Sequence, residues 1–310
     1  MKQLTIGSRG SKLALAQTHL VRSLLQREFP GLEVSVRKIR TTGDKLTATP
    51  LSQLAGENKG LFVKEIEEAL LDRSIDLAVH SLKDLPTDLP DGLVLGAIPR
   101  REDPRDALVS GSPMGSLDQL PAGSRIGTSS LRRETQLRHL RPDLEIVPVR
   151  GNVDTRIRKI DSEGLAAVVL AVAGLRRMAL DSHISFIFPA DQMIPAVGQG
   201  ALGLEVRRGD EEVEELVSRL DDGNTRAAVQ AERAFLDIMG GGCQVPMGAH
   251  ASLGGGRARL AAFVASPTGE RMIRDTIEGP EQELREMAIR LARSFRESGA
   301  DKILAEVGLG

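Results

Sequence analysis

Several residue types that mark common protein classes are scarce in this 310-residue chain. It has one cysteine, which excludes an internal disulfide and the metal sites that need several cysteines. It has seven phenylalanines and neither tyrosine nor tryptophan, so a surface that stacks the bases of single-stranded nucleic acid is difficult to build. No run of about 18 apolar residues is present, and the amino terminus lacks the apolar segment of a signal peptide. We therefore expect a cytoplasmic protein that spans no membrane.

Charge of one sign is also lacking, because 41 lysine and arginine residues are balanced by 43 acidic ones. A net charge of −2 gives little support to nonspecific binding along a nucleic-acid backbone. The basic residues are uneven in kind, however, since 32 are arginine and 9 are lysine. Arginine binds a carboxylate or phosphate through a planar pair of donors, whereas lysine is a point charge. A genome rich in arginine codons would explain the same bias, so the count alone indicates no ligand.

Alternating strand and helix patterns run through the first hundred residues, which is typical of a parallel α/β sheet. The helix pattern at residues 11–29 places Leu13, Ala16, Leu20 and Leu24 on one apolar face. Residues 41–59 contain Gly, Pro, Thr and Asn without periodicity, and we interpret them as a lid over a site. Strand patterns occupy residues 4–7, 33–39, 75–79 and 93–98, and a second helix pattern occupies residues 60–71.

The alternation restarts after a charged, proline-bounded hinge at residues 99–104. The sequence Ile-Gly-Thr-Ser at 126–129 echoes Ile-Gly-Ser-Arg at 6–9, and each leads from a strand pattern into a helix pattern. Free backbone N–H groups and the helix dipole attract anions at such turns. We therefore expect two α/β lobes with a ligand cleft at the carboxyl ends of their strands. Residues 220–310 change to long helices and an antiparallel strand pair, which predicts a smaller α+β domain.

Cys243 follows three glycines that come directly after a helix pattern. These glycines end the helix and leave the thiol with little steric cover. A helix carboxyl end disfavours a thiolate, which argues against a nucleophile that is regenerated in each turnover. The position suits a thiol that is alkylated once and then serves as a tether. A lone cysteine is more often a small buried apolar residue, and that alternative stays open.

The sequence His80-Ser-Leu-Lys-Asp84 follows a strand pattern, at the place where α/β sheets position working groups. Asp84 is a candidate general acid or a carboxylate that stabilises a developing cation, and Lys83 is a candidate ligand for a substrate carboxylate. An ordinary turn explains an aspartate before Leu-Pro equally well. No second histidine stands at metal-ligand spacing from His80, so we interpret His80 as structural.

Arginines and hydroxyl residues recur where predicted strands end. Arg132 and Arg133 fall in the first turn of a predicted helix, where cations oppose the helix dipole unless an anion is bound. Solvation of the surface explains any one of these residues but not their recurrence. The same pattern includes Thr128, Ser129, Ser130, Arg150, Arg156, Arg176 and Arg177.

Together these segments resemble the porphobilinogen deaminase family, also called hydroxymethylbilane synthases, over nearly the whole chain. The most specific match is Gly241-Gly-Cys-Gln-Val-Pro246, which resembles the family's cofactor-attachment motif. Further matches are SRGSKLAL at 8–15, KGLFVKE at 59–65, HSLKD at 80–84, REDPRD at 101–106, GTSSLRR at 127–133, RGN at 150–152, PAVGQG at 195–200 and ERAF at 232–235.

The resemblance implies an α/β fold of two lobes like those of periplasmic binding proteins, with a smaller α+β carboxyl-terminal domain. The domains would be 1–99 with 200–218 returning to it, 104–195, and 220–310 with the cofactor cysteine. It implies a monomeric transferase of tetrapyrrole biosynthesis that joins four porphobilinogen molecules head to tail, releases ammonia, and yields hydroxymethylbilane. Cys243 would hold a dipyrromethane cofactor through a thioether, and this cofactor would prime the growing chain.

The resemblance also assigns roles to single residues and implies neither a metal nor a nucleic-acid partner. Asp84 would help to protonate the leaving amine, bond the pyrrole N–H groups, and offset the azafulvenium cation as it forms. Gln199 would lie on the crossing back to the first domain. The implied cofactor ligands are Ser11, Lys83, Asp84, Thr128, Ser129, Ser130, Arg132, Arg133 and Arg150. The implied substrate ligands are Arg9, Arg150, Arg156, Arg177 and Gln199, with Lys59 and Phe62 covering the cleft.

Two other functions account for part of the sequence. A cytosolic binding protein for a polyanion would use the arginines but leave Cys243 without a role. A hydrolase with a cysteine nucleophile would pair Cys243 with His80 or His250, and iodoacetamide would then inactivate it rapidly. An alkylated sulfur would resist the same reagent.

Overall fold

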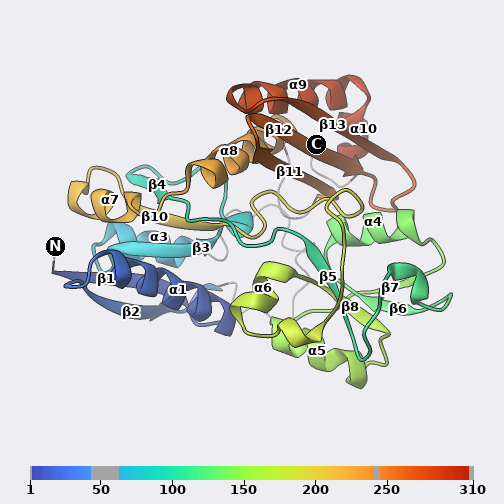
Figure 1. Cartoon of the computed structure of the whole chain (residues 1–310), viewed down its shortest axis with the longest axis horizontal. Coiled ribbons are helices and arrows are strands. Elements are labelled where there is room, and N and C mark those ends of the chain that lie inside the picture. Colours follow the sequence, from blue (N-terminus) through green and yellow to red (C-terminus); the bar gives the residue numbers. More distant parts are fainter. Residues whose placement is uncertain (1, 43–62, 241–244, 307–310) are drawn as a thin grey trace. The chain divides into compact units, whose positions relative to one another are not determined.

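The computed structural model describes residues 2–42, 63–240 and 245–306. The described residues form two five-stranded sheets and one three-stranded sheet (Figure 1). The chain divides into two compact units, Met1–Glu102 with Ala201–Arg226, and Asp103–Gly200 with Ala227–Gly310. The proposed lid at residues 41–59 lies outside the described residues except for Thr41 and Thr42.

The first unit contains a mixed sheet with the strand order β2-β1-β3-β10-β4. β1 is parallel to β2 and β3, whereas β10 runs antiparallel between β3 and β4. The four strands of the first hundred residues therefore run in the same direction, as predicted, and the sheet is mixed because β10 returns from far along the chain. The strands are β1 (Gln3–Arg9), β2 (Glu33–Ile39), β3 (Leu77–Ser81), β4 (Leu93–Ala97) and β10 (Leu202–Arg207).

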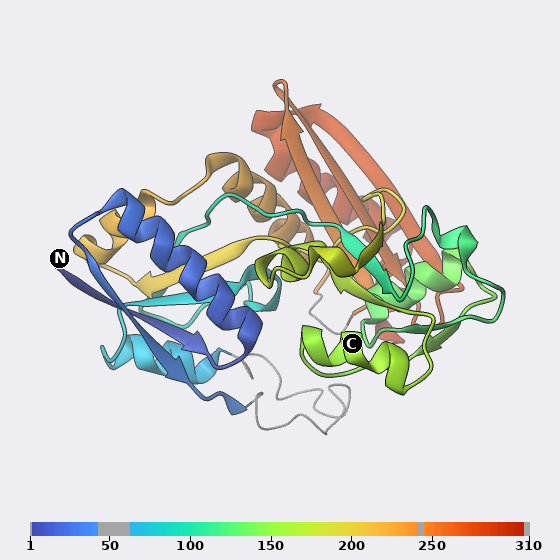
Figure 2. The same cartoon turned by 60° about the horizontal axis from the view of Figure 1, so that its bottom comes forward.

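Helices cover both faces of this sheet. Figure 2 shows α1 (Lys12–Glu28) and α3 (Lys64–Leu71) on opposite sides of it, and α7 (Glu211–Ser218) shares an apolar core with α1. The predicted apolar face of α1 is wrong, since Leu20 is 42% exposed while Val21 and Leu25 are fully buried. Gln17 lies on the buried face because its side chain donates a hydrogen bond to Ser81. Since Gln17 is polar, a search for apolar residues at helical spacing does not identify this face as buried.

The sheet of the second unit repeats the arrangement of the first, with the order β7-β6-β8-β5-β9 and with β5 antiparallel to both of its neighbours. β6 therefore takes the place of β1, which confirms the predicted echo. β1 and β6 each contain a glycine, Gly7 and Gly127, at a position without room for a side chain. A Cβ would lie 2.3 Å from Ile75 Cδ1 at Gly7 and 2.6 Å from Val149 Cγ2 at Gly127. The strands are β5 (Asp106–Ser110), β6 (Arg125–Gly127), β7 (Glu145–Val147), β8 (Ala167–Ala171) and β9 (Ile184–Ile187).

The helices of the second sheet also pack on both of its faces. α4 shares a core with β6 through Leu137 and Ile126, and α5 and α6 contribute Ile160 and Leu175 to the core of the other face. The helices are α4 (Leu131–Leu140), α5 (Val153–Ser162) and α6 (Val172–Arg177). Short helical turns complete the described part of the chain at Leu82–Asp84, Leu117–Gln119, Asp181–His183 and Glu281–Glu283.

The three-stranded sheet is antiparallel, and three helices share the core on one of its faces. Phe235 and Phe295 meet edge to face in this core, with ring centroids 5.3 Å apart. The predicted antiparallel strand pair is confirmed as β12 and β13. The elements are α8 (Gly223–Ile238), β11 (Met247–Gly254), β12 (Arg257–Ala265), β13 (Met272–Pro280), α9 (Leu284–Glu297) and α10 (Ala300–Ala305).

The predicted fold class is confirmed: two α/β sheets of the same topology are followed by a smaller α+β portion. In each α/β lobe, the antiparallel strand is the first strand after the chain crosses from the other lobe. This strand is β10 in the first lobe and β5 in the second. Within the described ranges, no helix combines the length and the apolar character that crossing a membrane requires.

Candidate active site

The Asp84 turn lies at the carboxyl end of β3 in the first unit. Asp84 is the last residue of the helical turn Leu82–Asp84, and its side chain is exposed. Leu82 fixes the turn, because its side chain is buried and its N–H donates to the Ala201 carbonyl at 3.1 Å. Gln17 Nε2 lies 2.8 Å from Ser81 Oγ and ties the strand end to α1. A rigid strand end thus presents an exposed carboxylate.

Two further predicted site residues of the first unit stand at the end of β1. Arg9 is the last residue of that strand and is half-buried. Ser11 caps α1, because its Oγ accepts a hydrogen bond from the Ala14 N–H at 3.3 Å. The cap gives Ser11 a structural role that the sequence pattern at a strand-to-helix turn also permits.

His80 is a buried structural residue. Its Nε2 lies 2.9 Å from Glu205 Oε2 on β10, and both side chains are almost fully buried. This contact agrees with the structural interpretation of His80 made from the sequence.

Hydroxyl groups hold the turn that leads from β6 into α4 in the second unit. Thr128 is buried and its Oγ1 accepts a hydrogen bond from the Ser130 N–H at 3.2 Å. Ser129 Oγ donates to the Val149 carbonyl at 2.9 Å and so joins this turn to the segment after β7. Ser130 is the N-cap residue of α4, without a hydrogen bond from its side chain to the helix. Hydrogen bonds within the chain therefore hold this turn.

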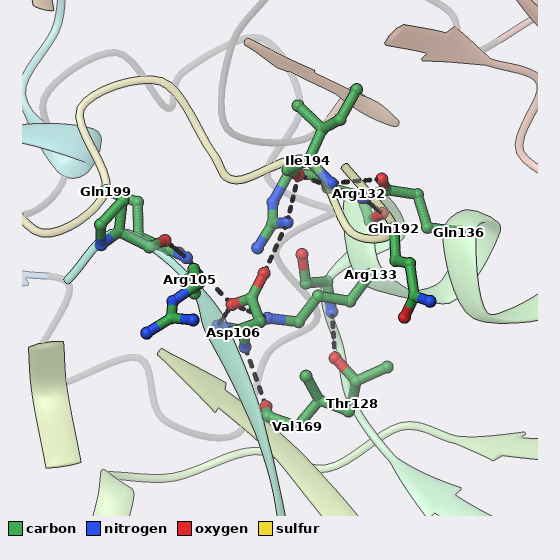
Figure 3. Close-up of polar contacts among 12 residues, drawn as sticks. Arg105, Asp106, Thr128, Arg132, Arg133, Gln136, Val169, Gln192, Ile194 and Gln199 are labelled. Atoms are coloured by element: carbon green, nitrogen blue, oxygen red, sulfur yellow. Dashed lines mark hydrogen bonds and ion pairs between the residues drawn. The ribbon is translucent and has the colours of Figure 1, made fainter. Parts of the chain in front are cut away.

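Asp106 is the centre of a buried charge cluster that the sequence analysis did not identify (Figure 3). Arg133 donates to Asp106 Oδ1 from Nε at 3.0 Å and from Nη2 at 2.8 Å, and its Nη1 donates to the Val169 carbonyl. Arg132 Nη1 lies 2.8 Å from Asp106 Oδ2 but is directed at the Ile194 carbonyl, so that contact with Asp106 is an ion pair rather than a hydrogen bond. The Arg133 guanidinium thus donates hydrogen bonds to groups of the chain itself, namely Asp106 and the Val169 carbonyl.

The Asp106 cluster carries more positive than negative charge. One carboxylate faces two guanidinium groups that are each about 5% exposed. Burial opposes ionisation of Asp106, but Arg132 and Arg133 outweigh it and hold its pKa well below the usual range. Burial also lowers the pKa of Arg132. Because an unbalanced buried cation is costly, the cluster fits an anionic group at the amino end of α4.

Gln199 joins the Asp106 cluster from the crossing segment that follows β9. Its Nε2 donates to the Pro104 carbonyl at 2.7 Å and to Asp106 Oδ1 at 3.0 Å. Arg177 Nη2 donates to the Gly200 carbonyl at 2.6 Å, beside Gln199. The two crossing segments of the chain, near residues 104 and 199, are thus bonded to each other within the second unit.

Removal of the Asp106 carboxylate should strongly destabilise the second unit. Asp106→Ala leaves two buried guanidiniums without their counter-charge, which costs about 3–5 kcal/mol of unfolding free energy. Because the pKa of Asp106 is depressed in the folded state, its contribution is present at neutral pH and is lost as pH falls through that low value. Denaturant unfolding measures the change. Asp143→Ala, which breaks the exposed ion pair with Arg141, is the matched control and should shift the midpoint little.

The remaining predicted ligands are distributed as follows. Arg150 is half-buried on the segment after β7, and Arg156 Nε donates to the Gly151 carbonyl at 2.8 Å. Lys83 is half-buried beside Asp84 in the first unit. Arg132, Arg133 and Gln199 contact Asp106, and Thr128 and Ser130 belong to the same unit, whereas Arg9, Ser11, Lys83 and Asp84 belong to the other unit. Lys59, Phe62 and Cys243 lie outside the described residues.

The segments on either side of Cys243 are well anchored. α8 ends at Ile238, and Gly240 adopts a left-handed conformation with φ of 64°, as expected for a glycine that ends a helix. Met239 before the loop and Val245 after it are both buried in the same core. Glu232 of α8 accepts hydrogen bonds from the N–H groups of Gly198 and Ala251, at 2.7 and 2.9 Å. The described residues on both sides of the segment that contains Cys243 are therefore fixed in one core.

Each unit carries side chains that can bind carboxylates. Guanidinium groups and hydroxyls recur at the strand ends of each unit, and such groups bind carboxylate oxygens. Within the described residues, no group of three or more histidine, cysteine or acidic side chains could hold a metal ion.

Sequence comparisons match the chain along its length to one family. Residues 4–215 match the model "Porphobilinogen deaminase, dipyromethane cofactor binding domain", and residues 226–297 match "Porphobilinogen deaminase, C-terminal domain". A porphobilinogen deaminase of Syntrophotalea carbinolica is 50% identical over 307 residues, covering 99% of this chain and 96% of the relative. The porphobilinogen deaminase of Geobacter metallireducens is 49% identical over 306 residues, covering 99% and 95%.

Solved structures give weaker matches. The methionine binding protein MetQ is 15% identical with a TM-score of 0.44, over 71% of this chain and 89% of that one. The periplasmic VFT2 domain of Bordetella pertussis BvgS is 14% identical with a TM-score of 0.41, over 71% and 86%.

Proposed function

The chain belongs to the porphobilinogen deaminase family, and we propose that Cys243 carries the dipyrromethane primer on which it works. The enzyme is a transferase of tetrapyrrole biosynthesis that joins porphobilinogen molecules head to tail and releases ammonia. When bound, the primer supplies the pyrrole carbon to which the first substrate unit is joined. The dipyrromethane cofactor is the one named for the matched domain.

The observation that carries the assignment of the ligands is the excess positive charge around Asp106. One carboxylate cannot neutralise both Arg132 and Arg133, so an acetate or propionate group bound there would complete the charge balance. Arg132 is the better placed ligand, because Arg133 directs its nitrogens to Asp106 and the Val169 carbonyl. In this proposal, Arg133 and Gln199 hold Asp106 and thereby orient Arg132.

The other ligands bind the carboxylates of the primer and of the growing product. Arg9, Arg150, Arg156 and Arg177 supply guanidinium groups at successive strand ends. Lys59 and Phe62 cover the site. The remaining primer ligands are Ser11, Lys83, Thr128, Ser129 and Ser130. Of these, Ser11 and Thr128 act chiefly through the turns that their hydroxyls hold.

Asp84 is the catalytic residue in this proposal. Its exposed carboxyl stands at the end of β3 and can donate a proton to the amine that leaves as ammonia. Loss of the amine gives a pyrrole cation, and a carboxylate close to the pyrrole N–H stabilises that positive charge as it develops. Lys83 beside it binds a carboxylate of the incoming substrate and so places the amine near Asp84.

Intact mass spectrometry tests the tether and the polymerisation together. We expect the purified chain to be heavier than its polypeptide by one dipyrromethane, and added porphobilinogen to give further increments of one pyrrole unit each. Ammonia release, measured in parallel, should accompany every increment. A polyanion-binding protein without chemistry would bind porphobilinogen but release no ammonia.

We further propose that the enzyme is a cytoplasmic monomer of three domains that acts without nucleic acid. A thiol that must react once with the primer needs a compartment in which cysteine stays reduced. One chain carries the primer cysteine, the carboxylate and the arginines, so a second copy adds no group that the chemistry requires. The proposed domains remain 1–99 with 200–218, 104–195 and 220–310. Light scattering of the holoenzyme measures the oligomeric state.

A further inference from the structure

Gln136 of α4 is a buried polar residue next to the proposed primer ligand Arg132, and it is not itself one of the proposed ligands. It is 1% exposed and follows Arg132 by one helical turn. Its Oε1 accepts a hydrogen bond from the Ile194 N–H at 2.7 Å, and its Nε2 donates to the Ile194 carbonyl at 3.2 Å. Nε2 also donates to the Arg132 carbonyl at 2.9 Å. The amide therefore binds groups of the chain through its acceptor and through both of its donors.

Arg132 and Gln136 donate to the same oxygen. Arg132 Nη1 lies 2.8 Å from the Ile194 carbonyl oxygen, to which Gln136 Nε2 also donates (Figure 3). Because Gln136 binds both the N–H and the carbonyl of Ile194, it fixes the direction of that carbonyl. A hydrogen bond weakens steeply when its angle departs from linearity, so a fixed carbonyl also fixes the guanidinium that donates to it. Gln136 thus acts on Arg132 through the backbone of Ile194.

The three-stranded sheet also holds Ile194 in place. The Ile194 side chain is fully buried and shares an apolar core with Ala261 and Phe263 of β12. A Cβ at Gly248 of β11 would lie 3.1 Å from the Ile194 carbonyl oxygen, so the strand and this carbonyl are in close contact. Ile194 is therefore fixed by its side chain against the sheet and by its backbone against α4.

A neutral side chain at position 136 leaves the charge of Arg132 available. In the cluster, one carboxylate, Asp106, faces the two buried guanidinium groups of Arg132 and Arg133. Gln136 satisfies backbone groups beside this cluster without adding charge to it. A carboxylate in its place would stand close to the Arg132 guanidinium, because the two side chains share an acceptor, and would neutralise the excess positive charge.

We propose that Gln136 is a positioning residue for Arg132. It aims the Arg132 guanidinium through the Ile194 carbonyl, and its lack of charge keeps one positive charge free for a carboxylate of the primer. The inference rests on the proposed function, in which Arg132 is a primer ligand. It explains why a side chain that both donates and accepts hydrogen bonds, and is neutral, stands one turn after that cation.

The test compares two variants, Gln136→Glu and Gln136→Leu. Gln136→Glu keeps the shape of the side chain and the hydrogen bond from the Ile194 N–H, and it offers Arg132 a carboxylate within the chain. Gln136→Leu adds no charge but leaves the buried Ile194 N–H without its partner, so it should be the less stable variant. Denaturant unfolding measures both midpoints in chains that also carry Cys243→Ser, so that no bound primer contributes to stability.

Primer loading should follow the opposite order to stability. Intact mass spectrometry of chains that keep Cys243 measures the fraction that carries the dipyrromethane. In Gln136→Glu this fraction should fall at least about tenfold, because the new carboxylate competes with the primer for Arg132. In Gln136→Leu it should fall only about two- to threefold, since Arg132 is less well aimed but keeps its charge. Gln119→Glu, an exposed change whose Oε1 can still accept the Gly115 N–H, is the matched control and should leave both measurements unchanged.

Two results would overturn the proposal. One is a Gln136→Glu chain that carries as much primer as the unchanged enzyme. The other is the same order of the two variants in both measurements, since a residue with only a structural role would lower primer loading in step with stability. The absence of the dipyrromethane mass from the unchanged enzyme would instead contradict the proposed function.

Discussion

Cys243→Ser should have the mass of the bare polypeptide and no measurable turnover of porphobilinogen. The reason is that a thiolate is a far better nucleophile than a serine hydroxyl, so the variant forms no thioether and lacks a primer to extend. The variant should fold normally, because Met239 and Val245, which anchor the two ends of the loop, are unchanged. Intact mass spectrometry and ammonia release measure the two losses.

A matched control for Cys243→Ser is Ser252→Ala, an exposed change on β11 that should keep both the added mass and the activity. Iodoacetamide supplies an independent measurement, since the single cysteine of the loaded enzyme is already alkylated and should take up no reagent. An active enzyme with a free thiol would contradict the tether.

Asp84→Ala should retain the fold and the covalent primer but lose turnover by a factor of about 10²–10⁴, the usual contribution of a general acid. The fold should persist because the Asp84 side chain is exposed and the turn is held by Leu82 and Ser81. Steady-state kcat and thermal unfolding together distinguish a chemical loss from a structural one.

The control for Asp84 is Asp91→Ala, which removes an exposed carboxylate from a later turn of the first unit. It should leave kcat unchanged. Asp84→Asn adds a finer comparison, because the amide can still bond a pyrrole group but can neither donate a carboxyl proton nor carry negative charge. Near-normal turnover in both Asp84 variants would remove this residue from the mechanism.

Elements with a regular local pattern were predicted well from the sequence. The strand at residues 33–39 has the predicted bounds as β2, and the helix predicted at residues 11–29 is α1, Lys12–Glu28. The prediction that is wrong involves partners distant in the sequence. The buried face of α1 includes Gln17 because its side chain donates a hydrogen bond to Ser81 of β3. The antiparallel direction of β10 had no signal in the first hundred residues, because this strand returns from far along the chain.

The candidate site shows the same division. Arg132 and Arg133 stood out because two cations in the first turn of a helix need an explanation, and the structure supplies part of it in Asp106. Asp106 itself had only a weak signal, since it follows the predicted hinge at residues 99–104 and appears only as the last residue of the REDPRD match at 101–106. The buried partner of His80 had no signal, because Glu205 is 125 residues away along the chain.

By itself, the sequence determined the class of the fold, the family and the types of group available for chemistry. These depend on local periodicity and on motifs such as the one around Cys243, which are properties of neighbouring residues. Only the tertiary structure decided which charges are buried together and how each is balanced. The reason is physical: the free energy of a buried charge depends on its burial and on its nearest counter-charges, and both are set by contacts between distant segments.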